Sequence, residues 1–230
     1  MRRAALILVC LSWFAGQSVA RAQAQEAAIA PASPPANGAQ TVDGVAARIE
    51  DDILTESELS ELAAFQQLVD GHAQPRDERI RELEDQWIVR GEAATAKFPQ
   101  PTKDEVESAY ARLVGQFPSS EAFRSRCAAV GLTEAGVRRL LTQQFYLSRF
   151  LDYRFRPAVQ VDQTQIQAYY RDEFTPQMKS RGQSAPPLDD VTDAIREVLV
   201  QRAINDRAKQ WLDDTRARLS IDVVSQGDQP

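Results

Sequence analysis

Beyond residue 42, apolar residues recur every three or four positions along most of the chain, which is the spacing of one face of an α-helix. Long stripes of this kind occupy 76–98, 134–155 and 190–219, and shorter ones follow Thr55, Thr102, Pro118 and Asp162. The side chains on these stripes, including Ala94 and Val198, are expected to face a core. The pattern predicts a mainly helical protein.

The predicted helices carry recognisable start and stop residues. Thr55 with Glu58, and Thr102 with Glu105, have the spacing of a capping box, in which a hydroxyl and a carboxylate bond the free N–H groups of the first turn. Gly131 follows a short helical stretch, as glycine commonly does at a helix C-terminus. We therefore expect several short, locally specified helices.

Strand signals lie at the two ends of this helical region. Residues 45–54 predict two short strands that turn at 50–52, and residues 221–224 predict a last strand. Pairing them would tie the two ends together, so the expected fold is a mainly α, multi-helix domain closed by a small sheet from N- and C-terminal strands. Residues 159–161 are expected to be extended, and residues 174–188, with three prolines and a glycine, to form a loop.

The first residues have the pattern of an export signal. Two arginines precede a short apolar run at 4–14, and Ala20-Arg21-Ala22 offers a small-x-small cleavage site. The run is shorter than the roughly 20 residues of a membrane-spanning helix, which favours a cleaved signal peptide over a membrane anchor. We predict a signal peptide at 1–22, a flexible leader at 23–41 and a disordered tail at 225–230.

The charge balance argues against a protein that grips nucleic acid. The chain has 27 basic and 33 acidic residues and a net charge of −6, and cleavage at residue 22 would remove three arginines and bring the net charge to −9. Cleavage would also remove Cys10, which leaves Cys127 as the only thiol and excludes an intramolecular disulfide. Cys127 shares a helical face with Phe123 and Val130, so we expect it to be buried rather than reactive.

A search for catalytic and metal-binding patterns yields no candidate. The common nucleophile, phosphate-loop and zinc motifs do not occur, and two Cys and one His are too few for a Cys/His zinc site, which needs about four ligands. His72 follows a glycine between two helices and is interpreted as an exposed loop residue. Adjacent carboxylates, such as Asp189 and Asp190, point in different directions on a helix. No catalytic, cofactor or metal residue is therefore assigned, and client-binding residues are not identified.

Charged and aromatic clusters are interpreted as structural. The charged stretch 76–86 is expected to be a solvated helix face. Trp87 and Trp211 lie on apolar stripes and are expected to pack rather than stack on a ligand. The long helix from 134 carries a concentration of arginines, at positions 138, 139, 149, 154 and 156. These arginines could form an anion-binding surface, but ion pairing with the acidic first and third helices is favoured.

The order of these segments resembles the chaperone module of SurA-like, parvulin-type exported proteins. The resemblance covers 42–224 and rests on five segments taken together. They are Val42 to Ile49, Phe123 to Leu132, Gly136 to Phe145, Val161 to Tyr170, and the helix with Trp211-Leu212 that leads into Ile221. It implies that residues 42–173 and 189–224 fold as one domain, which binds unfolded polypeptides after export.

Many members of that family carry a prolyl isomerase domain at the point that residues 174–188 occupy here. These few residues are too short for such a domain, and the histidines of its active site are absent. We therefore expect a periplasmic, non-enzymatic holdase for unfolded envelope or outer-membrane proteins, without cofactors, nucleic acid or stable membrane insertion. The alternative is a non-catalytic scaffold for one specific envelope partner.

Overall fold

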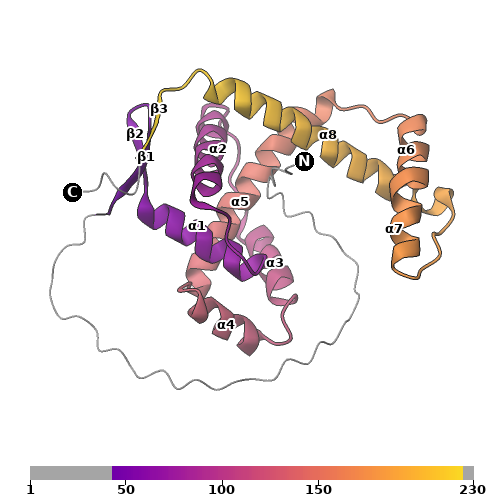
Figure 1. The fold of residues 1–230 in the computed structure, drawn as a ribbon, viewed down its shortest axis with the longest axis horizontal. Coiled ribbons are helices and arrows are strands. Elements are labelled where there is room, and N and C mark those ends of the chain that lie inside the picture. The colour runs from indigo at the N-terminus through magenta and orange to yellow at the C-terminus, as the bar shows by residue number, and fades with distance from the viewer. Residues whose placement is uncertain (1–42, 225–230) are drawn as a thin grey trace. The chain divides into compact units, whose positions relative to one another are not determined.

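The computed structural model describes residues 43–224, which from Gly44 onward belong to one compact unit. The predicted signal peptide at 1–22, the leader at 23–41 and the tail at 225–230 lie outside the described residues. The fold is mainly helical with one small sheet, as the hydrophobic pattern predicts (Figure 1).

The elements follow one another in the order strand, strand, helices, strand. The strands are β1 (Val45–Ile49), β2 (Asp52–Thr55) and β3 (Ile221–Val223). The helices are α1 (Glu56–Val69), α2 (Arg76–Thr95), α3 (Lys103–Val114), α4 (Ser120–Ala129), α5 (Glu134–Phe155), α6 (Gln163–Tyr169), α7 (Thr175–Ser180) and α8 (Leu188–Arg216). Two shorter turns, the 3₁₀ turn η1 (Arg156–Ala158) and the π-helical turn η2 (Tyr170–Phe174), follow α5 and α6.

Both predicted capping boxes are present, at Thr55 with Glu58 and at Thr102 with Glu105. Helix α2 ends three residues before the predicted Phe98. Lys97 has a φ of +51°, and the Phe98 N–H donates to the Ala93 carbonyl at 2.9 Å. The left-handed conformation of Lys97 and the hydrogen bond from Phe98 back to Ala93 form a Schellman motif, which ends the helix before Pro99 and Pro101.

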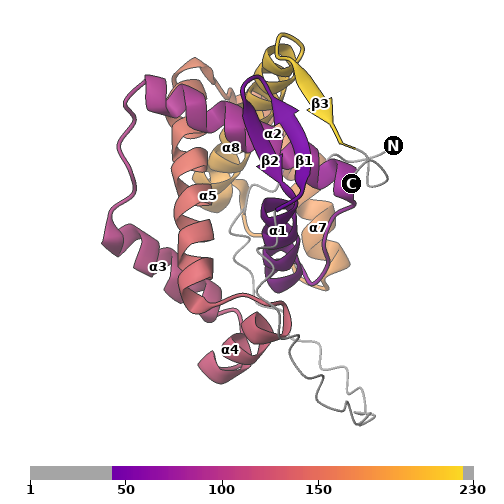
Figure 2. The ribbon, with the colours of Figure 1, turned by 90° about the vertical axis from the view of Figure 1, so that its left-hand side faces the viewer.

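The predicted sheet between the chain's two ends is confirmed. Its order is β2-β1-β3, and both pairings are antiparallel. The hairpin between β1 and β2 turns at Glu50, whose φ is +51°. Figure 2 shows the three strands side by side, with β3 at one edge. Strand β3 thus joins the end of α8 to the start of the described chain.

The prediction of a loop at 174–188 is wrong for most of these residues. The chain continues from α6 through η2 into α7, and only 181–187 lack helical structure. Pro176 fits because it lies in the first turn of α7, where its missing N–H is not required, and the preceding π turn carries the Thr175 N–H to the Tyr170 carbonyl. Residues 159–161 form no strand, although Val159 itself is extended.

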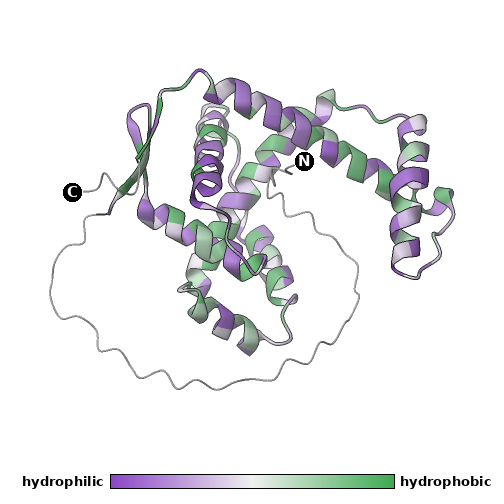
Figure 3. Ribbon diagram, viewed as in Figure 1, coloured by the Kyte–Doolittle hydropathy of each residue, from purple (hydrophilic) through white to green (hydrophobic). Residues whose placement is uncertain are grey.

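Apolar side chains form three clusters, and α5 takes part in two of them. One lies between the sheet, α1 and α2, a second between α1, α3, α4 and α5, and a third between α2, α5 and α8. Figure 3 shows how apolar and polar residues alternate along these helices. Two predicted core residues are exposed, Ala94 and Val198. Ala93, about 100° around the helix from Ala94, is the one that is buried.

Candidate functional site

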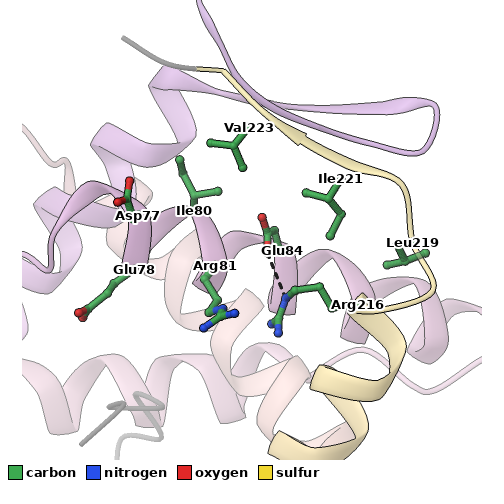
Figure 4. A pocket seen from close by; sticks show the side chains of 9 residues that line it. All are labelled: Asp77, Glu78, Ile80, Arg81, Glu84, Arg216, Leu219, Ile221 and Val223. Carbon is green, nitrogen blue, oxygen red and sulfur yellow. Dashed lines mark hydrogen bonds and ion pairs between the residues drawn. The ribbon is translucent and has the colours of Figure 1, made fainter. Parts of the chain in front are cut away.

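An open groove of about 600 Å³ lies between the first turns of α2 and the segment that runs from the end of α8 through β3 (Figure 4). Its apolar lining comes from Ile80 on α2 and from Leu219, Ile221 and Val223 on the opposite segment. Ile80 is buried, Leu219 and Ile221 are half-buried, and Val223 is 47% exposed. The groove therefore offers accessible apolar surface beside the edge of the sheet.

The strand places two of these side chains on one face. Ile221 and Val223 are two residues apart in β3, and alternate residues of a strand point to the same side. Figure 4 shows both side chains directed toward α2, with Ile80 opposite them. The alternation of the sequence Ile-Asp-Val thus sets the apolar character of the groove, and Asp222 lies on the other face of the strand.

An ion-pair cluster holds α8 against α2 at one end of the groove. Arg216 Nε lies 3.1 Å from a Glu84 carboxylate oxygen, and the same guanidinium contacts Asp85 and Asp213. Glu84 is only 5% exposed, and burial raises its pKa against the opposing effect of Arg216. Burial likewise raises the pKa of Asp85 to about 6. Because β3 begins five residues after Arg216, this cluster fixes where β3 starts.

A second buried polar network links α2 to α1. Gln66 is 2% exposed; its Nε2 donates to Glu82 at 2.9 Å, and its Oε1 accepts from the Gln74 N–H at 2.9 Å. Burial, the largest influence, raises the pKa of Glu82 to about 7, although the bonds from Gln66 and Gln86 act in the opposite direction.

The interpretation of 76–86 as a solvated helix face is therefore wrong for part of this stretch. Helix α2 lies between α1 and α8, so acidic side chains on two of its sides meet neighbouring helices. Glu82 meets the α1 side, whereas Glu84 and Asp85 meet the α8 side. Successive residues of a helix point in all directions around its axis. In a run of charged residues, the sequence therefore does not show which of them a neighbouring helix will cover.

The arginines of α5 mostly pair as predicted. Arg138 and Arg149 reach Glu107 and Glu105 on α3, at 2.9 and 3.1 Å, and Arg139 pairs with Glu61 on α1. The remaining two pair elsewhere, Arg154 with Glu92 on α2, and Arg156, in η1, with Asp152 and Glu197. Ion pairing, rather than an anion-binding surface, accounts for these five cations.

The other residues that the sequence singled out lie apart from the groove lining. His72 is exposed, with its Nδ1 3.1 Å from the Asp70 carbonyl. Trp87 and Trp211 are half-buried against the core clusters, as predicted, and the Trp87 indole also donates to Asp52 at 2.8 Å. Sequence reasoning missed the groove: the strand signal at 221–224 predicts that Ile221 and Val223 share one face, but not that α2 and the end of α8 lie beside them.

Cys127 is buried, as predicted, at 2% exposure, and burial raises the pKa of its thiol. We expect a thiol reagent to label native protein at least about a hundredfold more slowly than urea-unfolded protein, because labelling requires local opening. The measurement is absorbance on reaction with Ellman's reagent in a Cys10→Ala background. The double variant Cys127→Ala with Ser125→Cys, which carries an exposed thiol on the same helix, should react quickly in both states. Rapid labelling of native Cys127 would contradict its burial.

Within residues 43–224, no group of three or more His, Cys, Asp or Glu side chains is arranged to hold a metal ion. No helix in the same range is long and apolar enough to cross a membrane. A scan of the chain against models of protein families finds no match, and a search of curated proteins finds none. The groove is accordingly the feature from which a function can be argued.

Proposed function

We propose that this protein is an exported, periplasmic holdase of the SurA-like kind, which binds unfolded envelope polypeptides without isomerising proline bonds. The observation that carries the proposal is the open groove whose apolar lining, Ile80, Leu219, Ile221 and Val223, lies along an edge strand. An unfolded chain presents both apolar side chains and free backbone groups, and this surface suits both.

The groove has the character of a weak and general binding surface rather than of a specific pocket. It is open, and its apolar residues are flanked by charged ones from α2 and α8. A surface of this size binds a short stretch of chain, so many different sequences are tolerated and none is held tightly. The net charge of −6 favours solubility while apolar side chains remain exposed.

The arrangement of the chain also supports the proposal. The family resemblance implies one domain made from the early helices and the last helix, and here α8 lies against α2 and α5, with β3 on β1. Only seven residues, 181–187, connect α7 to α8, and they lie within the interval 174–188, where many members of the SurA-like family carry an isomerase. The proposal is therefore of a chaperone module alone.

An aggregation assay tests this function. A urea-unfolded outer-membrane β-barrel protein is diluted into buffer with increasing amounts of the purified protein, and light scattering is followed. We expect suppression near stoichiometric ratios, and none from a helical control protein of similar net charge. Absence of suppression at large excess would contradict the holdase. Recovery of one stoichiometric partner from envelope extract would then favour the single-partner scaffold.

A further inference from the structure

The register of the sheet determines which backbone groups of β3 remain free. Two backbone hydrogen bonds flank the β1–β3 pair. The Glu50 N–H donates to the Ser220 carbonyl, and the Val224 N–H donates to the Ala46 carbonyl. Bonded pairs alternate along an antiparallel ladder, so Asp222 also faces β1, opposite Arg48. The N–H and carbonyl groups of Ile221 and Val223 therefore point away from β1, and β3 is an edge of the sheet.

This free edge borders the groove. Ile221 and Val223 contribute both the outward backbone groups and apolar side chains to its lining. A strand added beside β3 would bond these backbone groups, and every second side chain of that strand would lie over α2 next to Ile80. An edge strand with an adjoining apolar groove is the arrangement by which proteins bind extended peptides as an additional strand.

The charged side chains at one end of the groove indicate which kind of side chain an added strand would have at that end. Arg76 donates to the Val224 carbonyl at 3.2 Å, which places the first turn of α2 at the end of β3. Asp77 and Glu78 follow in that turn, are exposed and form no ion pair with another residue of 43–224. Figure 4 shows Asp77 on the strand side of α2, whereas Glu78 and Arg81 point away from β3.

We propose that the groove binds one extended polypeptide segment as a fourth strand on β3, with apolar residues at alternate positions and a basic residue beside Asp77. This inference rests on the proposed function and specifies how the client is held. Backbone hydrogen bonds are the same for nearly every sequence, so they supply affinity without demanding a particular client. The chain's own last residues, Ser-Gln-Gly-Asp-Gln-Pro, are polar and acidic and do not fit this description.

The test uses a labelled peptide, Lys-Thr-Val-Thr-Val-Thr-Lys with blocked ends, and fluorescence anisotropy. Two derivatives carry N-methyl groups, one on the threonines and one on the valines. The N–H groups of alternate residues face opposite sides of a strand, so we expect one derivative to bind at least tenfold more weakly and the other to retain most of its affinity. Equal binding by both derivatives would overturn the added strand. The proposed function would survive if aggregation is still suppressed.

Protein variants test the same idea from the other side. Val223→Pro removes an outward N–H that takes no part in the ladder, a position where an edge strand tolerates proline. We expect peptide affinity to fall at least tenfold. Ile53→Pro is the matched control, because Ile53 lies on β2, the opposite edge strand, and is 54% exposed. Ile53 is opposite Arg48 in a pair without backbone hydrogen bonds, so its N–H also points away from β1. Equal loss in both variants would overturn the proposal, and circular dichroism checks that each remains folded.

The charge prediction is tested by exchange. Asp77→Lys should weaken the lysine-ended peptide severalfold and strengthen a glutamate-ended one, whereas Glu78→Lys, on the side of α2 away from β3, should change both much less. If the preference between the two peptides does not change, the assigned position of the basic residue is wrong. If the protein instead forms a dimer that Val223→Pro dissociates in sedimentation, the occupant is a second copy and the proposed peptide is wrong. If no peptide binds and aggregation is not suppressed, the proposed function itself fails.

Discussion

Replacing Arg216 by alanine should lower the free energy of unfolding by about 3 kcal/mol. The substitution leaves Glu84, which is 5% exposed, and the largely buried Asp85 without the guanidinium that contacts both. A buried carboxylate that loses the cation it contacts retains its desolvation cost, so the damage exceeds the value of the ion pair itself. The side chain of Arg216 is 13% exposed, and solvent cannot readily replace it.

Urea unfolding followed by circular dichroism measures this effect. Arg218→Ala is the matched control, because Arg218 is exposed two residues away and its side chain bonds only Thr215 in the described part of the chain. We expect the control to change the free energy by less than about 0.5 kcal/mol. Equal effects in the two variants would mean that the cluster on α2 does not depend on Arg216.

Replacing Glu82 by glutamine should raise the free energy of unfolding at pH 8 by about 2 kcal/mol and have little effect at pH 4.5. Burial raises the pKa of Glu82 to about 7 from an ordinary value of 4.5, so the folded protein holds this proton more tightly than the unfolded chain does. The contribution to stability is fully present below pH 4.5 and is lost as the pH rises to about 7. Asp85 and Asp70 act in the same direction, and the Gln66 amide can bond glutamine equally well.

The measurement is the difference in unfolding free energy between Glu82→Gln and the parent protein, determined at pH 4.5 and at pH 8. Glu78→Gln, an exposed change on the same helix, should shift the free energy by less than about 0.5 kcal/mol at both pH values. A difference for Glu82→Gln that does not change with pH would show that packing, rather than ionisation, is responsible.

Local chemistry made much of this fold predictable. The capping boxes at Thr55 and Thr102 set helix starts by bonds within four residues, so the sequence alone identifies them. The terminal strands were also predictable, because short β-branched runs at both ends have few partners except each other. By contrast, the continuation of α6 into α7 depends on a π turn that relieves Pro176, and residue preferences do not encode that accommodation.

The candidate site was less predictable, for a different reason. The groove exists only because α2, the end of α8 and β3 converge, and each of them contributes a few unremarkable residues such as Ile80 and Val223. The buried acids Glu82 and Glu84 look like any solvated helix charges until two neighbouring helices cover them. Sequence periodicity reports which face of a helix is apolar, but it does not report which polar residues tertiary packing will enclose.

The pairing of β3 with β1 also has a consequence for synthesis in the cell. Glu50 and Ser220, which bond across this pair, are 170 residues apart in the chain. Closing so long a loop is slow compared with forming neighbouring helices, and it cannot begin until the last residues have emerged. Until then one edge of β1 is unpaired, and β3 does not yet lie beside α2. A chain that stops before residue 221 therefore leaves this edge of β1 unpaired and removes Ile221 from the apolar cluster between the sheet, α1 and α2.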